Sequence, residues 1–490
     1  QLPAGTGVNF VAAMKFKQEY SKLANGDWVL TTDDMMAELE LVTMLRQVLV
    51  IRTTGLQNYA FEPIDPHLFK GKAKKAYDPN AKMRDDGFWE QHRTTALSKH
   101  NMGNFIKRMG RTKGFKTVMF VVKAFAENFV ETGSEKMASK IDIGPVNTFI
   151  SKNYIDGIRL RAAARTTANL SPHWFAEGYY AYGTKSKDHY YGGKLTYSFR
   201  KPEYQPTEFP VRTLSFESYR DLESPSDKYL VHNKDNIFMT FRPVKVEKLY
   251  LYNRQRLGFQ WETDYGFSTQ IQLNTESHRP LGKLYYERMD GSFVDKVRMT
   301  SLTLGFDYRP GQSYINSKQR RFEVNLDAPQ FTLSHTIGLK NVLGGQFSYN
   351  LTEFSAYKRI WLGSWGKFDM RLKAGAQWNK VPYHLLIMPP VNTSYFEHQG
   401  SFNLMENLEF LNDRYAQFNI AWNLEGKVFN RIPLVKKLKW REYLAFKGMW
   451  GHLTDKNNPL LPQNAADTEL YKFPEGTNVM GKKPYLEFVV

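Results

Sequence analysis

The chain has 490 residues, about three times the length of a typical domain, so it forms either several domains or one large closed architecture. It contains no cysteine, which excludes disulfides, thiolate metal sites and cysteine nucleophiles. Its 67 lysines and arginines exceed the 49 acidic residues and give a net charge of +18. That excess favours an anionic partner, either nucleic acid or phosphorylated lipid.

The N-terminal part is predicted to form a small β-rich domain over residues 1–95. Short strands are expected at 10–20, 28–32 and 38–54. Asp33-Asp34 would bind a cation or, as for most acidic pairs in polar segments, simply be solvated; the same holds for Asp85-Asp86.

Residues 96–150 are predicted to be a helical, basic linker at a membrane interface. Residues 64–117 carry 13 lysines and arginines against five acids, and helices are expected at about 96–109 and 115–131. The second helix has an apolar stripe at helical spacing. That stripe either packs on the small domain or under the β-barrel that the later strands predict, or it lies flat on the inner leaflet with the basic residues at lipid phosphates.

From residue 157 onward the hydrophobic period is two, which predicts about a dozen strands with one apolar and one polar face. The clearest strands are expected at 157–168, 367–379 and 415–429. The alternating runs are about 9 to 14 residues long, longer than the usual ~5–6 of strands in soluble proteins. Aromatic residues mark the ends of their apolar faces, as a girdle at the membrane interface would: Trp174, Tyr182, Tyr308, Trp378 and Trp450.

These strands predict a mainly β fold in which residues 151–490 form a transmembrane antiparallel β-barrel of about 14–16 strands. A large soluble all-β fold is the alternative, since its strands would also alternate. No apolar stretch is long enough for a membrane-spanning helix, because Lys123 and Glu127 interrupt the best one. The apolar residues lie at even positions before Asp327–Pro329 and at odd positions after it, so the chain is expected to bulge or turn there.

The connection 380–414 is far longer than the usual ~4–6 residues and is rich in apolar side chains. The turn at 430–439 is short, basic and contains proline, which suits the periplasmic side and places 380–414 on the extracellular side. We expect this segment to fold over or into the barrel mouth as a lid, or to be a docking surface for another outer-membrane protein. The candidate lid residues are Leu385, Leu386, Ile387, Phe402 and Leu408.

The first strand of the predicted barrel carries Arg159, Arg161 and Arg165 on its polar face. They are candidate lumen-lining residues that would select anions. The alternative is structural: the arginines would pair with carboxylates of the next strand, such as Glu177.

Six segments together resemble a family of Bacteroidota outer-membrane proteins known only as a domain of unknown function: IDIGPV (141–146), RTTANL (165–170), EGYYAYG (177–183), NLDAPQFTLSHT (325–336), KAGAQWNKVP (373–382) and NRIPLVKKLKW (430–440). The resemblance runs from about Trp28 to the end of the chain. More weakly, the last segment resembles the BamA-like surface-antigen barrels. The family implies an outer-membrane barrel with a periplasmic N-terminal part, and it carries no functional residues over to this chain.

Two features depart from that family. Its members usually carry an N-terminal carboxypeptidase-like regulatory domain, which is missing here, and the chain stops at Tyr485–Val490 inside a predicted strand. Residue 1 is Gln without a leader, so the chain is expected to be mature, trimmed or a fragment. One to three further strands are expected after Val490, because an open edge in hydrocarbon leaves backbone groups unpaired.

No motif for catalysis or cofactor binding is found: the phosphate-binding loop, the zinc-protease helix and the serine-hydrolase elbow are all missing. Ser334 and His335 are adjacent in a strand and so point to opposite faces. The chain is therefore predicted to be non-enzymatic, with no cofactor, no metal and no nucleic-acid partner.

The predicted function is an outer-membrane barrel of the Gram-negative cell envelope that serves transport, export or outer-membrane assembly, with its N-terminal region in the periplasm. Its expected partners are outer-membrane lipid, including lipopolysaccharide, and other envelope proteins in a complex. The alternatives are an outer-membrane barrel hydrolase of lipid or peptide, and a soluble, aromatic-rich glycan-binding protein.

Overall fold

The computed structural model describes residues 11–39, 48–63, 85–92, 113–133, 137–229, 233–240, 245–396 and 398–490. The chain divides into two compact units, one made of residues 1–116 and 424–442 and the other of residues 117–423 and 443–490. The division into 1–95, 96–150 and 151–490 stays a prediction. The predicted helix at 96–109 lies outside the described residues.

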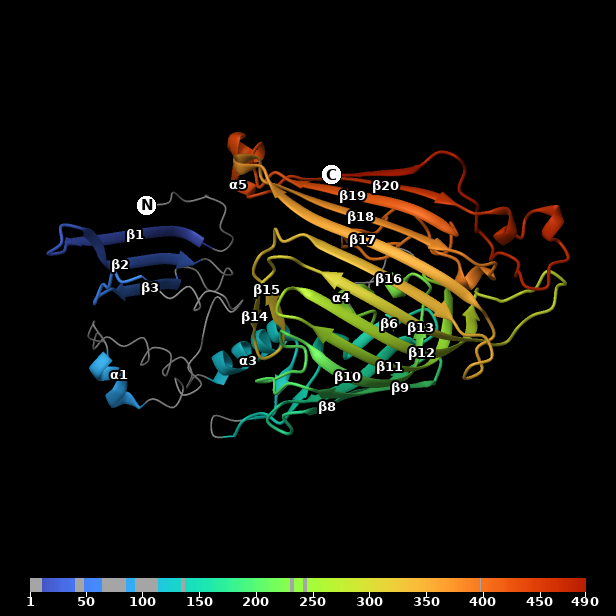
Figure 1. Cartoon of the computed structure of the whole chain (residues 1–490), viewed down its shortest axis with the longest axis horizontal. Coiled ribbons are helices and arrows are strands. Elements are labelled where there is room, and N and C mark those ends of the chain that lie inside the picture. Colours follow the sequence, from blue (N-terminus) through green and yellow to red (C-terminus); the bar gives the residue numbers. More distant parts are fainter. Residues whose placement is uncertain are drawn as a thin grey trace. The chain divides into compact units, whose positions relative to one another are not determined.

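The first unit contains a three-stranded antiparallel sheet of β1 (Val11–Lys22), β2 (Trp28–Leu39) and β3 (Val48–Gly55) (Figure 1). Asp33 pairs with Arg52 of β3 at 2.9 Å, and Asp85 accepts the backbone N–H of Phe88 at the start of α1 (Asp86–His92). These two aspartates therefore have protein partners.

The second unit is built on one large antiparallel sheet, which makes the protein mainly β (Figure 1). Within the described residues sixteen strands belong to it, in the order β21 to β16, β13 to β7, β5 and β4, with β6 also paired to β7. The sheet begins with three short strands, β4 (Val130–Glu131), β5 (Ile141–Ile143) and β6 (Ile150–Asn153). Thus β4 and β5 lie inside the range predicted to be a linker.

Thirteen strands form the rest of the sheet, and each pairs with its neighbours in unbroken register. They are β7 (Gly157–Thr166), β8 (Trp174–Gly183), β9 (His189–Ser198), β10 (Arg212–Glu223), β11 (Lys248–Glu262), β12 (Phe267–Gly282), β13 (Val297–Tyr308), β16 (Gln330–Gly338), β17 (Tyr349–Trp361), β18 (Lys367–Gln377), β19 (Arg414–Asn423), β20 (Tyr443–His452) and β21 (Tyr485–Val489). Strand pairing joins β21 to β20 and β4 to β5, and in the described part of the chain it does not join the two ends of the sheet. The strand pairing therefore shows a large antiparallel sheet, and the closed barrel that the sequence predicts remains a proposal.

One strand boundary and one turn differ from those predicted. The alternation of apolar residues continues to Val428, yet β19 ends at Asn423, because Leu424 begins a connection that contains α5 (Pro433–Leu438). The short turn expected at 430–439 is therefore a helix within the longer connection 424–442. Its end is marked by Lys439, which takes the left-handed conformation common at helix C-termini.

At Asp327–Pro329, where the apolar residues switch from even to odd positions, the chain makes a turn. It separates β15 (Arg321–Glu323) from β16, and β15 pairs only with β14 (Tyr314–Asn316), outside the large sheet. The described helices of this unit are α3 (Lys113–Glu127), at the position predicted for the second helix, and the short α4 (Ile237–Thr240). None of the helices within the described ranges has the length and apolar content that a membrane crossing needs.

The two faces of the large sheet differ in a way that reverses the usual order of a soluble protein. Opposite side chains on β18, β19, β20 and β21 form apolar rows, such as Leu372, Phe418, Gly448 and Leu486, and Leu372 and Leu486 are about half exposed. The other face carries Lys447 and Glu487, which are 1% and 3% exposed. We call these the apolar face and the polar face.

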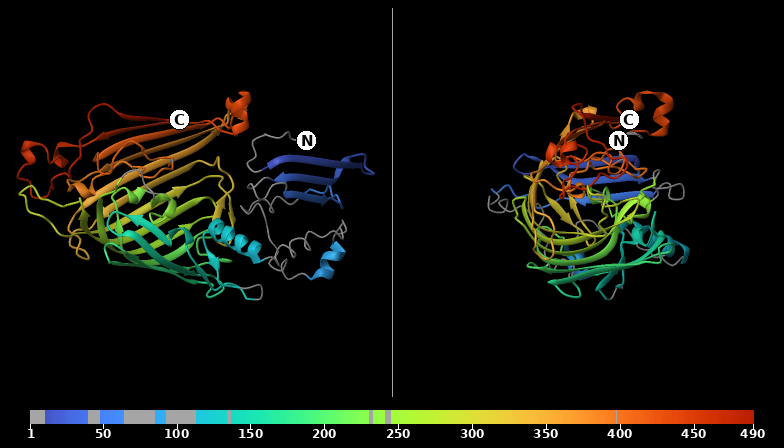
Figure 2. Two further views of the ribbon diagram at one scale, coloured as in Figure 1. Left: turned by 180° about the vertical axis from the view of Figure 1, so that it is seen from behind. Right: turned by 90° about the vertical axis from the view of Figure 1, so that its right-hand side faces the viewer.

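The sheet is strongly curved (Figure 2). Its polar face is covered by the connecting segments that follow β12, β18 and β20, and by the segment after β10 through Lys234 and Asp235. These segments, together with the polar face, form the interior of the unit.

The two faces predict opposite responses to substitution. If the apolar face meets lipid, Leu372→Arg should cost about 2–4 kcal/mol of unfolding free energy, because a charge would be placed in hydrocarbon. Lys373→Gln, one residue further on and on the polar face, should be tolerated because the polar contacts of the interior remain available. Urea unfolding in detergent micelles measures both, and equal losses would contradict the assignment of the faces.

Candidate functional site in the interior of the sheet

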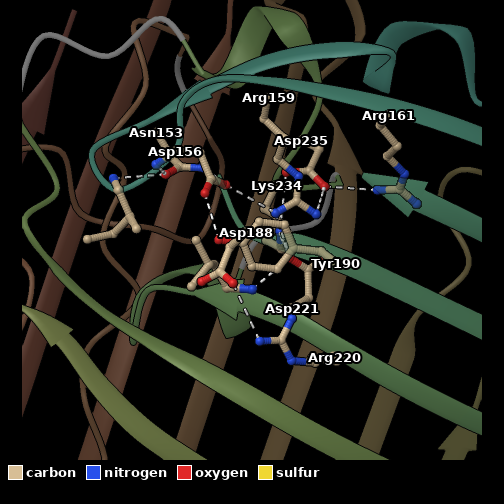
Figure 3. A network of polar contacts seen from close by, with 12 residues as sticks. Asn153, Asp156, Arg159, Arg161, Asp188, Tyr190, Arg220, Asp221, Lys234 and Asp235 are labelled. Carbon is tan, nitrogen blue, oxygen red and sulfur yellow. Dashed lines mark hydrogen bonds and ion pairs between the residues drawn. The ribbon is translucent and has the colours of Figure 1, made fainter. Parts of the chain in front are cut away.

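The candidate lumen residue Arg159 lies at the centre of a buried network of charges (Figure 3). Its side chain is fully buried, and its guanidinium lies 2.7 Å from the carboxylate of Asp221 on β10. Asp156 at 3.6 Å and Asp235 at 3.5 Å complete its set of ion pairs. Asp156 directly precedes β7, whereas Asp221 and Asp235 come from beyond β8, the next strand along the chain.

Arg161 extends the same network along β7. Its guanidinium donates a hydrogen bond to Asp235 at 2.9 Å and lies over the ring of Tyr179 at 3.7 Å. Lys234 contributes a third cation, with its ammonium 3.3 Å from Asp221 and 3.2 Å from Asp235. Burial would raise the pKa of Asp235, but Lys234 and Arg159 beside it hold that pKa below its ordinary value. Asp235 is therefore ionised.

Asp156 ties the turn between β6 and β7 into the network. Its carboxylate accepts hydrogen bonds from Tyr190 at 2.6 Å, Ser186 at 2.7 Å and Asn153 at 2.8 Å. Three carboxylates thus meet three cations inside the unit. Buried charges of this kind persist only when each is paired, since removing one partner leaves an uncompensated charge.

Arg165, the third candidate arginine, lies apart from this network. Its guanidinium lies over the ring of Phe129 at 3.4 Å and bonds to the side chain of Gln319. Glu177 is directly opposite it in register, but the two do not form an ion pair in the described structure. Both line a cavity of about 170 Å³ that also contains the ion pair of Lys194 and Glu217, at 3.1 Å.

The candidate lid residues are placed together in the interior. Leu386 and Leu408 are buried against Tyr250, Met299 and Tyr349 of the sheet, and Leu385 packs on the same cluster. Phe402 is buried in a second cluster with Met449 of β20. Ile387 is buried as well, and its backbone pairs with that of Asn412.

Polar groups of the sheet also hold this segment. Glu487 of β21 accepts the backbone N–H groups of Asn403 at 2.9 Å and Leu404 at 2.7 Å. Lys447 of β20 donates to the backbone carbonyl of Ser401 at 2.8 Å. The charges of the polar face thus satisfy backbone groups of the covering segment, which would otherwise be buried without partners.

Two adjoining cavities remain between this segment and the sheet. The larger, of about 480 Å³, lies against β16, β17, β18 and β19, and the smaller, of about 180 Å³, lies against β11 and β12. Lys228, His384, Leu386 and Met388 line both. The smaller cavity contains a paired set of charges in which Arg254 contacts Glu223 at 3.1 Å and also pairs with Glu276.

His384 is the least satisfied polar side chain at this junction. Neither of its ring nitrogens has a hydrogen-bond partner among the described residues, and both are shielded from bulk solvent. The rings of Tyr286, Phe347 and Tyr471 surround it at 5.1–5.6 Å between centroids. Burial lowers the pKa of His384 to about 3, helped by His278 and Lys228, so the ring is neutral at neutral pH. Each unsatisfied buried polar group costs about 1–3 kcal/mol.

Sequence reasoning found the three arginines but not the groups that complete the site. Asp221 and Asp235 lie 62 and 76 positions after Arg159, and the alternating pattern of β10 contains no sign that its aspartate meets β7. His384 lies in an apolar run, where a lone histidine is rarely informative. Anion selection by the arginines and the action of the lid stay predictions.

Comparison with known proteins gives the family. Residues 130–457 match the C-terminal domain of a family of unknown function, DUF5686. The chain belongs to this family. No curated protein matches. A solved structure of BamA from Haemophilus ducreyi lacking POTRA domains 1–3 is similar at 10% identity with a TM-score of 0.35, over 95% of this chain and 82% of that one. At this TM-score the likeness carries no information on the function of the DUF5686 protein.

The network around Arg159 predicts that replacing this arginine by an uncharged residue strongly lowers the free energy of unfolding. Arg159→Met should lower the unfolding free energy by about 3–5 kcal/mol, because it leaves three buried carboxylates with two cations. Arg220→Met is the matched control: Arg220 lies 3.7 Å from Asp188, whose side chain is half exposed, and such a pair contributes about 0–1 kcal/mol. Equal urea midpoints for the two variants in detergent would show that the network does not stabilise the fold.

Proposed function

We propose that this chain forms a non-enzymatic β-barrel of the Gram-negative outer membrane, with a filled lumen, and that it serves transport, export or outer-membrane assembly. The observation that carries the proposal is the reversed burial of the large sheet. Leucine, phenylalanine and tryptophan side chains are exposed along one face, whereas arginine, lysine and glutamate are buried behind the other. Water as the outer solvent would favour the opposite arrangement, and hydrocarbon favours this one.

The positions of exposed aromatic residues support the same conclusion. Trp174, Trp261 and Trp361 lie at one end of their strands, and Trp378 and Trp450 lie at the other end of the sheet. Aromatic rings at both ends of an apolar band are typical of the two interfaces of a membrane.

The connections between strands support an orientation. At the end of the sheet that holds turns 167–173, 263–266 and 362–366, several connections are short. At the other end, connections 224–247, 378–413 and 453–484 are long. Outer-membrane barrels have short periplasmic turns and longer extracellular loops, so we place the segment 380–414 on the extracellular side. The N-terminal unit would then be periplasmic.

The packing of segment 380–414 supports a closed rather than an open lumen. Its apolar residues contact polar-face side chains of β11, β13 and β17, and two buried charges of β20 and β21 hold its backbone. Free diffusion through the interior would require this segment to move. An exposed docking surface, the alternative, would leave these side chains accessible.

The barrel itself is tested by gel mobility after extraction from membranes. The folded barrel should migrate faster before boiling than after it, because a hydrogen-bonded barrel resists unfolding by sodium dodecyl sulfate at room temperature. It should also require detergent to leave the membrane fraction. A protein that stays in solution without detergent and shows one mobility in both lanes would be the soluble, glycan-binding alternative.

The closed lumen is tested by conductance in a planar bilayer. The wild-type protein should show no steady pore, and deletion of 384–411 should give steady conductance because the segment that fills the interior is removed. Heat-modifiable mobility of the deletion variant checks that its barrel is folded. Glu487→Gln, which weakens the hold on Asn403 and Leu404, should give brief openings. Steady wild-type conductance that the deletion leaves unchanged would contradict the lid.

A further inference from the structure

The cavity of about 480 Å³ in the interior has the size of a small-molecule site. It lies between two walls of different chemistry. The sheet contributes hydroxyl, amide and charged side chains, among them Ser334, Thr336, Ser355, Lys373 and Gln417. The covering segment contributes Leu385 to Met388 and Pro390. A molecule that fits both walls is amphipathic.

Lys373 gives this cavity a positive charge that the acid Glu353 offsets only in part, without an ion pair. Its neighbours in register on β17 and β19 are Ser355 and Gln417, neither of which carries a charge. In the described structure no carboxylate forms an ion pair with Lys373. The one acid that lines the cavity, Glu353, accepts a hydrogen bond from Tyr415 at 3.2 Å, and Lys228 lines the cavity as a second cation.

Two polar groups in the lining lack protein partners within the described residues. His384 has a free donor and a free acceptor on its neutral ring, and Gln417 has an unpaired carbonyl oxygen. They lie in opposite walls of the cavity, one on the covering segment and one on β19. Buried polar groups are normally satisfied, so a molecule in the cavity is expected to satisfy these two.

We propose that this cavity binds a small organic anion, whose carboxylate or similar anionic group meets Lys373 and whose apolar body lies against Leu385 to Met388. Water would satisfy His384 and the hydroxyls, but it would leave Lys373 without an ion pair and would wet an apolar wall. An organic cation would be repelled by Lys373. This inference goes beyond the proposed function, because it rests on the geometry of the cavity and holds whether or not the lumen conducts.

Three probes that share one body and differ in charge test the proposal: 4-(trifluoromethyl)benzoate, the neutral benzamide and the cationic benzylamine. Fluorine NMR of the full chain in detergent micelles, with empty micelles as background, measures saturable binding. The benzoate should bind at least ~10-fold more tightly than the other two, since only it offers a counter-charge to Lys373. Equal binding of all three, or no saturable binding of the benzoate, would overturn the proposal and leave a water-filled cavity.

Variants locate the binding in this cavity. Lys373→Gln should weaken benzoate binding at least ~10-fold, and Lys373→Arg should restore most of it because the charge returns. Lys194→Gln is the matched control, since Lys194 is also a lysine of the polar face but lines the separate cavity of Arg165 and Glu177. Heat-modifiable mobility confirms that each variant is folded. Binding that is unchanged in Lys373→Gln, or that is lost equally in Lys194→Gln, would place the benzoate elsewhere and contradict the site.

Discussion

The structure depends on one constraint: the large sheet turns its charged face inward, so every charge and every backbone group on that side must find a partner within the protein. In water such an arrangement would be unfavourable, because the apolar face would remain hydrated while ions were desolvated. In a membrane the preference is reversed, and the interior becomes the place where polar groups belong. The connecting segments, the ion pairs and the cavities all follow from this requirement.

The interior meets that requirement in two different ways. Near β7 and β10 the charges neutralise one another, with Arg159, Arg161 and Lys234 set against three aspartates. Near β20 and β21 the charges instead hold backbone groups of the segment that covers them. The first arrangement joins strands to the segment around Asp235, and the second joins the sheet to the segment 380–414. Both reduce the freedom of long connections that would otherwise be mobile.

Between these two regions the partners are incomplete, and there the cavities lie. His384 and Gln417 have polar atoms there that neither the sheet nor the covering segment pairs within the described residues. In a well-packed interior such mismatches are rare, because each one lowers stability. At this junction the unpaired atoms of His384 and Gln417 line the same cavity, from the covering segment and from the sheet.

The alternation of apolar and polar residues predicted the strands and their two faces, and the six resembling segments predicted the family of unknown function. Alternation is a local property, because successive side chains of a strand point to opposite sides whatever the strand pairs with. The pattern therefore predicted β7, β18 and the start of β19, and it placed Arg159 and Lys373 on the polar face. The same pattern failed beyond Asn423, where the alternation continues but the hydrogen-bonded partner strand β20 does not.

Which polar groups meet could not be predicted from the strand pattern. Arg159 was expected to select anions or to pair with a carboxylate such as Glu177 on the adjacent strand, yet its partners come from β10 and from the segment around Asp235. The burial of Leu386 and Phe402, and the unpaired ring of His384, likewise depend on how a long connection lies against the sheet. The physical reason is that a strand's pattern specifies a face, whereas a contact across the interior depends on the curvature of the sheet and the path of every connection.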